Sequence, residues 1–387
     1  MKRHVLLCLV CVLHVVSITA TSQITDSVVN AQNRLILKAD SLMSAYNFEK
    51  ALKVLVQSAN INTDILLRIG QCQNQLGAWV SAIRSYEQII QMDSTHVVAL
   101  NQLGQLFARN AEFKSSLQIY LNLIEFDSTN SYYYKNAGMM AANLNDRSQA
   151  KLLFEEACKL NPTDVEALLA LGNILFDMDD YEGADKIVQQ ALASAPAFRP
   201  VLLLQAKLAY EQHQYTAAIS TLNKLILSSD TTILFARMLC VSYFNLHDYS
   251  NVMNCVNFLI RNHFDSEWLY YYMGVAVREL GNVKGSVDWF KLAIDRSISD
   301  NMKTYYSQLA KSYESMGDYA NAITAYKAAY NYSMEGIYLY HLARNYDIFY
   351  KDKSTALLYY EKYLQSEDTV RLAREYARLR MQDMGKF

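Results

Sequence analysis

The residues whose types and spacing suggest chemistry are two histidines and one acidic stretch. His213 and His247 stand 34 residues apart, and both fall in segments with the composition of hairpin turns. Along one edge of a repeating structure, two such imidazoles would be able to bind a metal ion. Polar residues are also common in turns for reasons of backbone geometry. We interpret both histidines as turn residues and predict that neither is a metal ligand.

The acidic stretch, residues 177–183, loosely resembles a calcium-binding loop. Such loops need glycine at the sixth position and glutamate at the twelfth. Glycine is missing from the sixth position here, and Val188 occupies the twelfth, so we interpret the stretch as a break between two helices. No HExxH, GxSxG, P-loop or GxGxxG motif is present in the sequence either. We therefore predict no catalytic residue, no metal and no cofactor, and a protein that is not an enzyme.

The composition favours one continuous array of helices over separate globular domains. The chain has 387 residues, of which 52% are hydrophobic, yet it contains only 3 prolines and 12 glycines. No Gly/Ser/Pro-rich linker or run of charge divides it. Its net charge of −2 offers no basic surface for nucleic acid or anionic lipid, so we predict neither as a partner.

The first 22 residues have the order of a secretory signal peptide. Residues 1–4 include two basic side chains, residues 5–16 are uncharged and largely apolar, and small residues precede Gln23. The apolar run is shorter than the roughly 20 residues that a membrane-spanning helix needs. We expect cleavage after residue 22, no membrane span in the mature chain, and a periplasmic or secreted location; an uncleaved anchor is the alternative. No small residue directly precedes Cys8 or Cys11, so we expect no lipid anchor.

Four cysteines follow the leader: Cys72, Cys158, Cys240 and Cys255. They are too few and too scattered for a disulfide framework or a CxxC zinc site. We interpret them as small hydrophobic residues of the core. Cys240 and Cys255 fall on facing helices of one predicted hairpin, so whether they form a disulfide stays open.

Small residues recur along the chain with a spacing of 34. Four glycines start the series, and the same step continues through other small residues: Gly70, Gly104, Gly138, Gly172, Ala206, Cys240 and Gly274. They lie within helical patterns of apolar residues, where glycine costs roughly 1 kcal/mol relative to alanine. A repeated penalty needs a compensating gain, and we infer that a second helix packs closely against the first at this point.

Two further sets of residues recur at the same period, on the second helix of each hairpin. Twelve positions after the markers stand small residues, at Ala82, Ser116, Ala150, Ala184, Ala218 and Ser286. Four positions further on stand larger residues, at Tyr86, Tyr120, Phe154, Val188, Leu222, Val256 and Phe290. We predict that the small residues face the markers across the hairpin and that the larger ones fill the core.

This pattern resembles the tetratricopeptide repeat, which has small residues at positions 8 and 20, an aromatic residue at 24 and proline at 32. The segment from Gly138 to Pro162 matches best, and the match weakens at both ends and between residues 200 and 300. The resemblance is to tetratricopeptide repeat proteins of the secreted bacterial type. It implies an all-α fold, a right-handed α-solenoid of about ten helical hairpins with a C-terminal capping helix.

The resemblance also sets the domain boundaries that we expect. Residues 1–22 are the signal peptide, 23–366 the solenoid and 367–387 the capping helix. The approximate repeats are 32–63, 64–96, 97–130, 131–164, 165–198, 199–232, 233–266, 267–302, 303–335 and 336–366. Charged residues on one side of the last segment suit a helix that solvates the end of the array.

In this family the exposed positions of the first helix of each hairpin line a concave wall, which implies a set of partner-binding residues. In the earlier repeats these positions are rich in amides: Asn74, Asn101, Gln105, Asn136 and Asn173. In the later repeats they are aromatic and basic: Tyr210, Arg237, Trp268, Tyr271, Arg278 and Lys311. Amides can bond the backbone of an extended peptide, and aromatic residues with arginine are typical of interface hot spots. The alternatives are a solvated helix face for the amides and packing between repeats for Trp268 and Tyr271.

Co-chaperone members of the family hold a C-terminal carboxylate with a clamp of Lys, Asn and Arg side chains. In this sequence the corresponding positions are occupied by Leu67, Gln71, Gln102, Tyr132 and Asn136. These residues do not make up such a clamp. We therefore do not predict that it captures the tails of heat-shock chaperones. From the repeat array and its wall we predict a non-enzymatic scaffold or adaptor for protein–protein interaction in the cell envelope. It would bind an extended peptide or a partner subunit in the concave groove and associate with an envelope complex. The alternative is a glycan- or nutrient-binding helical protein of the envelope.

Overall fold

A computed structural model describes residues 32–58, 60–226, 233–297, 301–368 and 370–385. These residues form α-helices joined by short turns, and no strand occurs among them. The chain divides into two compact units, Met1–Pro196 and Ala197–Phe387. The predicted signal peptide, residues 1–22, lies outside the described residues.

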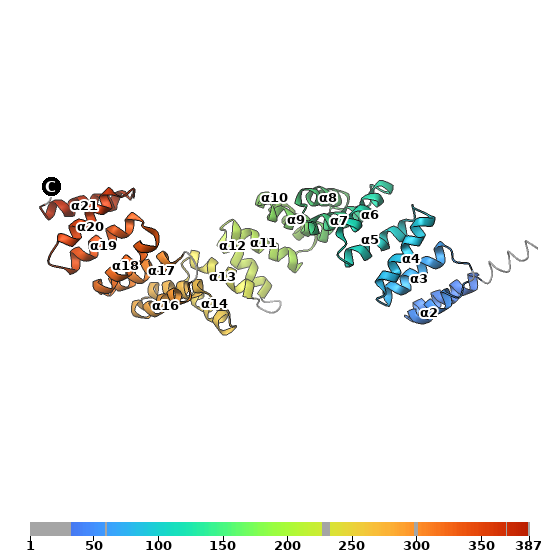
Figure 1. Ribbon diagram of the computed structural model, residues 1–387, viewed down its shortest axis with the longest axis horizontal. Helices are drawn as coiled ribbons and strands as arrows, with labels where there is room; N and C mark the ends of the chain where they lie inside the picture. The colour runs from blue at the N-terminus through green and yellow to red at the C-terminus, as the bar shows by residue number, and fades with distance from the viewer. Residues whose placement is uncertain (1–31, 59, 227–232, 298–300, 369, 386–387) are drawn as a thin grey trace, which may run out of the picture. The chain divides into compact units, whose positions relative to one another are not determined.

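Helices alternate with turns along both units (Figure 1). In the first unit residues 32–44 are helical, followed by α2 (Phe48–Leu55), α3 (Thr63–Gln75), α4 (Trp79–Met92), α5 (Val97–Arg109), α6 (Phe113–Phe126), α7 (Ser131–Asn143), α8 (Arg147–Leu160), α9 (Val165–Asp177) and α10 (Tyr181–Ser194). In the second unit the helices are α11 (Arg199–Glu211), α12 (Tyr215–Ile226), α13 (Ile233–Asn245), α14 (Tyr249–Arg261), α15 (Glu267–Glu279), α16 (Val283–Arg296), α17 (Met302–Ser315), α18 (Tyr319–Ser333), α19 (Gly336–Phe349), α20 (Ser354–Gln365) and α21 (Arg371–Asp383).

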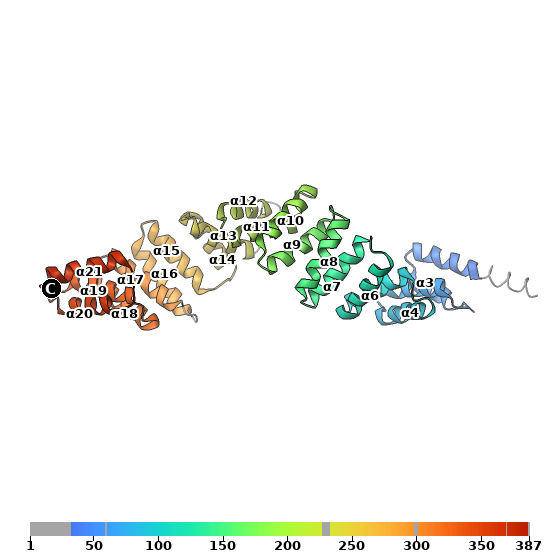
Figure 2. The ribbon, with the colours of Figure 1, turned by 90° about the horizontal axis from the view of Figure 1, so that it is seen from above.

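Helices that follow one another in the chain pack side by side in space (Figure 2). In the first unit each helix from α2 to α9 contacts the next one, and in the second unit the same holds for each helix from α11 to α20. Neighbouring odd-numbered helices also meet, as α7 does with α9 and α15 with α17. Each unit is therefore a stack of helical hairpins, and the predicted all-helical solenoid of hairpins is confirmed. We call the odd-numbered helices α3 to α19 the first helices and the even-numbered helices α4 to α20 the second helices.

The hairpins turn through residues with left-handed backbone geometry. These residues recur at steps of 34, with φ between 58° and 94°, at Gly77, Ala111, Asn145, Asp179, His213, His247 and Gly281. Residues other than glycine adopt this region rarely, and asparagine, aspartate and histidine do so more often than the rest. In several hairpins the next residue is an aspartate that caps the second helix. Asp146, for example, accepts a hydrogen bond from the backbone N–H of Gln149 at 2.9 Å.

This turn geometry explains the two histidines that share the repeat spacing. His213 and His247 both occupy the left-handed position, with φ of 58° and 59°. The Nδ1 atom of each ring shares a hydrogen bond with a tyrosine hydroxyl two residues later, at 3.0 Å for Tyr215 and 2.9 Å for Tyr249. Their interpretation as turn residues is confirmed.

The core of the hairpins rests on a contact between a glycine of the first helix and a ring of the second. A methyl group added to Gly138 or Gly274 would lie 2.8 Å from ring carbons of Phe154 or Phe290. Both rings are almost fully buried, which confirms that the larger residues of the pattern fill the core. The glycine's nearest neighbour is thus the ring sixteen positions later, whereas we expected the small residue twelve positions later. A helical side chain leans toward the N-terminus of its own helix, so the ring covers the preceding turn.

The small residues do lie on the facing side of the second helix. Ser116 is fully buried, and its Oγ donates a hydrogen bond to the carbonyl oxygen of Gly104 at 2.8 Å. Ser286 is equally buried, and its Oγ lies 2.9 Å from Oγ of Ser312 in the next hairpin. These serines satisfy backbone or hydroxyl groups at the tightest point of the hairpin, where a larger side chain would not fit.

The cysteines of the described chain are free thiols. Cys72, Cys158 and Cys240 are buried, in agreement with their interpretation as core residues. Cys255 is half-buried and does not form a disulfide with Cys240. Burial raises the pKa of the Cys72 and Cys255 thiols to about 11, so both remain protonated at neutral pH.

The helices are short compared with the thickness of a bilayer. The longest of those bounded above, α18, has 15 residues, whereas a membrane span needs roughly 20 apolar residues. Over the described ranges, no helix has both the length and the apolar character to cross a membrane.

The last helix, α21, forms an ion pair with a buried carboxylate of α19. It packs on α20 and buries Ala373, Ala377 and Met381. Asp347 of α19 is only 5% exposed and accepts two hydrogen bonds from the guanidinium of Arg380, at 2.9 and 3.2 Å. A side chain at the far end of α21 therefore compensates a charge that α19 buries.

Candidate functional site

The amide-rich positions lie on the first helices α3, α5, α7 and α9, as the sequence predicted, but they differ in what they contact. Gln105 donates a hydrogen bond from Nε2 to the hydroxyl of Tyr132 at 2.9 Å. Asn136 donates from Nδ2 to the carbonyl oxygen of Tyr132 at 2.7 Å. Asn173 is exposed. Part of the amide set thus bonds within the chain, and part of it faces solvent.

Asn74 and Asn101 have a different character, because each is half-buried with an amide oxygen that has lost access to water. Neither Oδ1 atom has a hydrogen-bond partner among the described residues. A buried acceptor without a donor costs about 1–3 kcal/mol. Among the predicted amides, these two gain most from a hydrogen-bond donor on a bound partner.

Trp268 and Tyr271 of α15 belong to an aromatic cluster within the second unit. Tyr271 contacts the rings of Tyr305 and Phe290, with centroids 5.4 and 6.3 Å apart. Trp268 meets Tyr272 edge to face at 5.3 Å. The alternative of packing between repeats therefore describes Tyr271 well, and burial raises the pKa of its hydroxyl.

Two of the predicted basic residues differ sharply in exposure. The side chain of Arg278 is 15% exposed, pairs with Glu279 at 3.2 Å and lies over the ring of Phe290 at 5.6 Å. Its guanidinium also donates to the carbonyl oxygen of Gln308 in the next hairpin. Arg278 is thus a packing residue, whereas Lys311 on α17 is exposed.

Arg237 and Tyr210 complete the predicted set. Arg237 is exposed, and its guanidinium lies 5.3 Å from the ring centroid of Phe264 and 5.8 Å from that of Trp268. Tyr210 is half-buried with its ring edge against Tyr215 at 6.3 Å, and burial raises the pKa of its hydroxyl. Arg237 therefore presents a charge held in place by aromatic rings, which is an arrangement that suits binding.

The structure also shows a polar cluster whose centre the sequence did not predict, on α17, α18 and α19. The carboxylate of Glu314 accepts hydrogen bonds from the hydroxyl of Tyr326 at 2.7 Å and from Nδ2 of Asn345 at 2.5 Å. The ring of His341 stacks on that of Tyr326, with centroids 4.8 Å apart and an angle of 6°. Glu314 and Tyr326 stand twelve positions apart, like the paired small residues of the repeat, and this spacing is the signal that would have revealed the contact.

The surroundings of His341 in this cluster change its ionisation. Burial lowers the pKa of His341 to about 4; the carboxylate of Glu314 opposes this shift, and the positive charges of Arg344 and Lys311 add to it. The Nδ1 atom has no hydrogen-bond partner within the described ranges. At neutral pH the ring is therefore uncharged and stacked on Tyr326.

The stability of the protein should consequently fall as the pH drops from about 6.5 to about 4. In that window the unfolded chain binds a proton at His341 and the folded chain does not, so acid favours unfolding. His341→Phe keeps the stack on Tyr326 and removes the proton site. We expect it to remove on the order of 2 kcal/mol of the acid-induced loss, measured as the free energy of unfolding in urea at a series of pH values. His263→Asn, at an exposed histidine, is the control; equal pH profiles for wild type and His341→Phe would contradict the assignment.

Three family models described as tetratricopeptide repeat match parts of the chain, at residues 64–94, 143–208 and 304–333. No curated protein matches the sequence. Solved structures that resemble parts of the chain include a tetratricopeptide repeat protein from Parabacteroides merdae, at 17% identity and a TM-score of 0.46, over 65% of this chain and 98% of that one. PilF of Pseudomonas aeruginosa is 18% identical with a TM-score of 0.46, over 55% of this chain and 97% of that one. A chain of the APC/C hetero-tetramer Cut9–Hcn1 is 15% identical with a TM-score of 0.41, over 90% of this chain and 84% of that one.

Proposed function

This chain is a tetratricopeptide repeat protein, and we propose that it acts as a non-enzymatic scaffold that holds a protein partner against its first helices. Stacked helical hairpins present long rows of side chains and rigid backbone, which suits the binding of an extended segment. The partner would be an extended peptide or a subunit of a larger assembly, and we propose that it sits in a groove lined by the first helices.

One observation carries the proposal: unsatisfied polar atoms gather on the first helices. Among the described residues, seven buried side-chain atoms lack a hydrogen-bond partner, and five of them belong to first helices: Asn74, Asn101, Gln308, His341 and Asn345. Three of these five atoms are amide oxygens of half-buried residues, namely Asn74, Asn101 and Gln308, and amide oxygens accept hydrogen bonds from backbone N–H groups. A bound peptide is a regular source of such donors, provided that the side chains shift enough to reach it.

We further propose that the scaffold works in the cell envelope, as a periplasmic or secreted protein that associates with an envelope complex. The support for this location is the order of charges and apolar residues in positions 1–22. Cleavage after residue 22 would release a chain that carries no leader, and the experiment that tests it is N-terminal sequencing of the protein recovered from envelope fractions.

The exposed cations of the first helices should be required for partner binding. Arg237 and Lys311 are exposed and lie on α13 and α17. Arg237→Glu with Lys311→Glu is expected to reduce the yield of the cross-linked partner at least tenfold, because two carboxylates replace the two cations and reverse the charge that the partner meets. The measurement is photo-cross-linking in the native cell, followed by quantification of the adduct.

A matched control uses cations of the second helices. Arg261 of α14 and Lys291 of α16 are equally exposed, and Arg261→Glu with Lys291→Glu should leave the adduct unchanged. Far-UV circular dichroism and melting should be the same for both double variants. Adducts that form only with second-helix positions would refute the first-helix site.

A further inference from the structure

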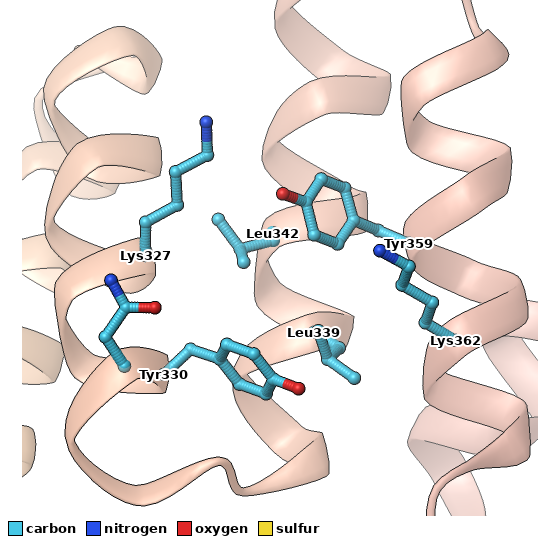
Figure 3. Close-up of a pocket in the computed structure, with 7 residues that line it drawn as sticks. Lys327, Tyr330, Leu339, Leu342, Tyr359 and Lys362 are labelled. Atoms are coloured by element: carbon cyan, nitrogen blue, oxygen red, sulfur yellow. The ribbon is translucent and has the colours of Figure 1, made fainter.

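A small cavity opens between α18, α19 and α20 in the second unit (Figure 3). Its volume is about 230 Å³. It is lined by Lys327, Tyr330 and Asn331 of α18, by Leu339 and Leu342 of α19, and by Tyr359 and Lys362 of α20. Figure 3 shows the two lysines on opposite walls with the two leucines between them. Most of the lining comes from second helices, so the cavity is separate from the scaffold site proposed above.

The cavity carries two positive charges and no negative one. No acidic residue lines it. Lys327 and Lys362 are both exposed, and neither forms an ion pair in the part of the chain that the structure describes. A hydrogen bond with the hydroxyl of Tyr346 raises the pKa of Lys327, so this side chain stays an ammonium ion at neutral pH. The cavity therefore has an unneutralised positive potential.

A stack of tyrosines fixes the two ammonium groups at the cavity. The rings of Tyr350, Tyr346 and Tyr359 follow one another with centroids 5.4 Å apart at both steps and angles of 24° and 15°. The Nζ atom of Lys327 lies 5.5 Å from the ring centroid of Tyr346, and that of Lys362 lies 5.6 Å from that of Tyr359. Cation–π attraction orients a lysine without neutralising it, because the ring has no net charge. The lysines remain available to an anion.

The base of the cavity is apolar. Leu339 is 5% exposed and Leu342 is 1% exposed, so both belong to the core beneath the opening. The amide of Asn331 and the hydroxyls of Tyr330 and Tyr359 add hydrogen-bond donors at the walls. At about 230 Å³ the cavity is smaller than the 300–1,000 Å³ typical of sites for drug-sized ligands. Its occupant is therefore about the size of one amino-acid residue.

We propose that this cavity binds a small organic carboxylate. The carboxylate oxygens lie between Lys327 and Lys362, and a short branched or aromatic carbon body rests on Leu339 and Leu342. A free acid and the carboxyl end of a peptide chain offer this same chemistry. The proposal extends beyond the scaffold function and does not depend on it.

The test titrates 4-methylpentanoate into the full-length protein and follows binding by isothermal titration calorimetry. We expect saturable binding with a Kd on the order of 1 mM, as for a ligand of this size. Lys327→Gln with Lys362→Gln should weaken binding at least tenfold. Lys291→Gln, at an exposed lysine of α16, should leave it unchanged.

Two probes test the chemistry on the wild-type protein and so do not depend on how the variants fold. The neutral 4-methylpentanamide and inorganic phosphate should each bind at least tenfold more weakly than the acid, since one lacks the charge and the other the apolar body. Equal binding of either probe, no effect of the double variant, or no saturable binding of the acid would overturn the proposal.

A further arm distinguishes the two sources of the carboxylate. It compares a leucine-terminated tetrapeptide with a free C-terminus against the same peptide with an amidated one. If the free-ended peptide binds more tightly than the acid, the proposed site is supported and its occupant is the carboxyl end of a peptide. A peptide that binds no more tightly than the acid supports the site with the free acid as its occupant.

Discussion

Replacing Phe154 by alanine is expected to lower the free energy of unfolding by about 3–5 kcal/mol, the range for removing a buried aromatic ring. The ring of Phe154 is 2% exposed and lies against Gly138. Because Gly138 has no side chain, the facing helix cannot fill the space that is left when the ring is removed. The loss combines the transfer of the ring from the core with the cavity that remains. Urea denaturation followed by circular dichroism measures the change.

The same contact predicts that Gly138→Ala destabilises the wild type and stabilises the Phe154→Ala variant. In the wild type, Gly138→Ala gains helix propensity of roughly 1 kcal/mol, but its new methyl group would lie 2.8 Å from the ring of Phe154. We therefore expect a net loss of about 1–3 kcal/mol from overpacking. In the Phe154→Ala background the methyl group enters empty space and should stabilise the protein. Additive effects in this double-mutant cycle would show that the two residues do not touch.

Removing the guanidinium of Arg380 is expected to lower the free energy of unfolding by about 3 kcal/mol. Breaking a buried ion pair leaves an uncompensated charge and costs about 3–5 kcal/mol. Asp347 is 5% exposed and would keep only Lys353, whose Nζ lies 3.3 Å from its Oδ1, so the lower end applies to Arg380→Met. Urea denaturation gives the global value, and hydrogen exchange of the α21 amides shows whether that helix is released.

Two variants separate this charge effect from loss of helix packing. Arg378→Met changes an exposed arginine of the same helix and should alter stability by less than about 0.5 kcal/mol. Asp347→Asn in the Arg380→Met background removes a buried carboxylate that only Lys353 still pairs with, and should recover part of the lost stability. If Arg378→Met is as harmful as Arg380→Met, the buried carboxylate is not the cause.

The sequence was sufficient to predict the helical hairpins and their core, because both depend on a local period. Small residues at Gly138 and Gly274 and large ones at Phe154 and Phe290 mark one face of each helix. The period does not tell which of two facing residues comes closest, since that depends on how far a side chain leans along its helix. For this reason the ring, and not the small residue before it, is the neighbour of the glycine.

The candidate site was harder to predict. The position of a residue in a helix determines which face of the helix it lies on, but not which neighbours a long side chain contacts. Arg278 stands at a position expected to be exposed, yet its long side chain folds over Phe290 and bonds to the next hairpin. Arg237 stands at a comparable position and stays exposed. The Glu314 cluster needs side chains from three helices to meet. The spacing of twelve indicates the contact of Glu314 with Tyr326, but it does not place Asn345 of the third helix beside them.

The order in which helices pack also determines how the chain reaches its fold. Within each unit the main contacts join helices that are at most two apart in the chain. Such a low contact order keeps loop-closure entropy small, which favours fast folding. Nucleation can start at any hairpin and propagate to its neighbours in either direction. Damage at one hairpin, such as the loss of Phe154, should therefore slow propagation through that point and leave nucleation at more distant hairpins unaffected.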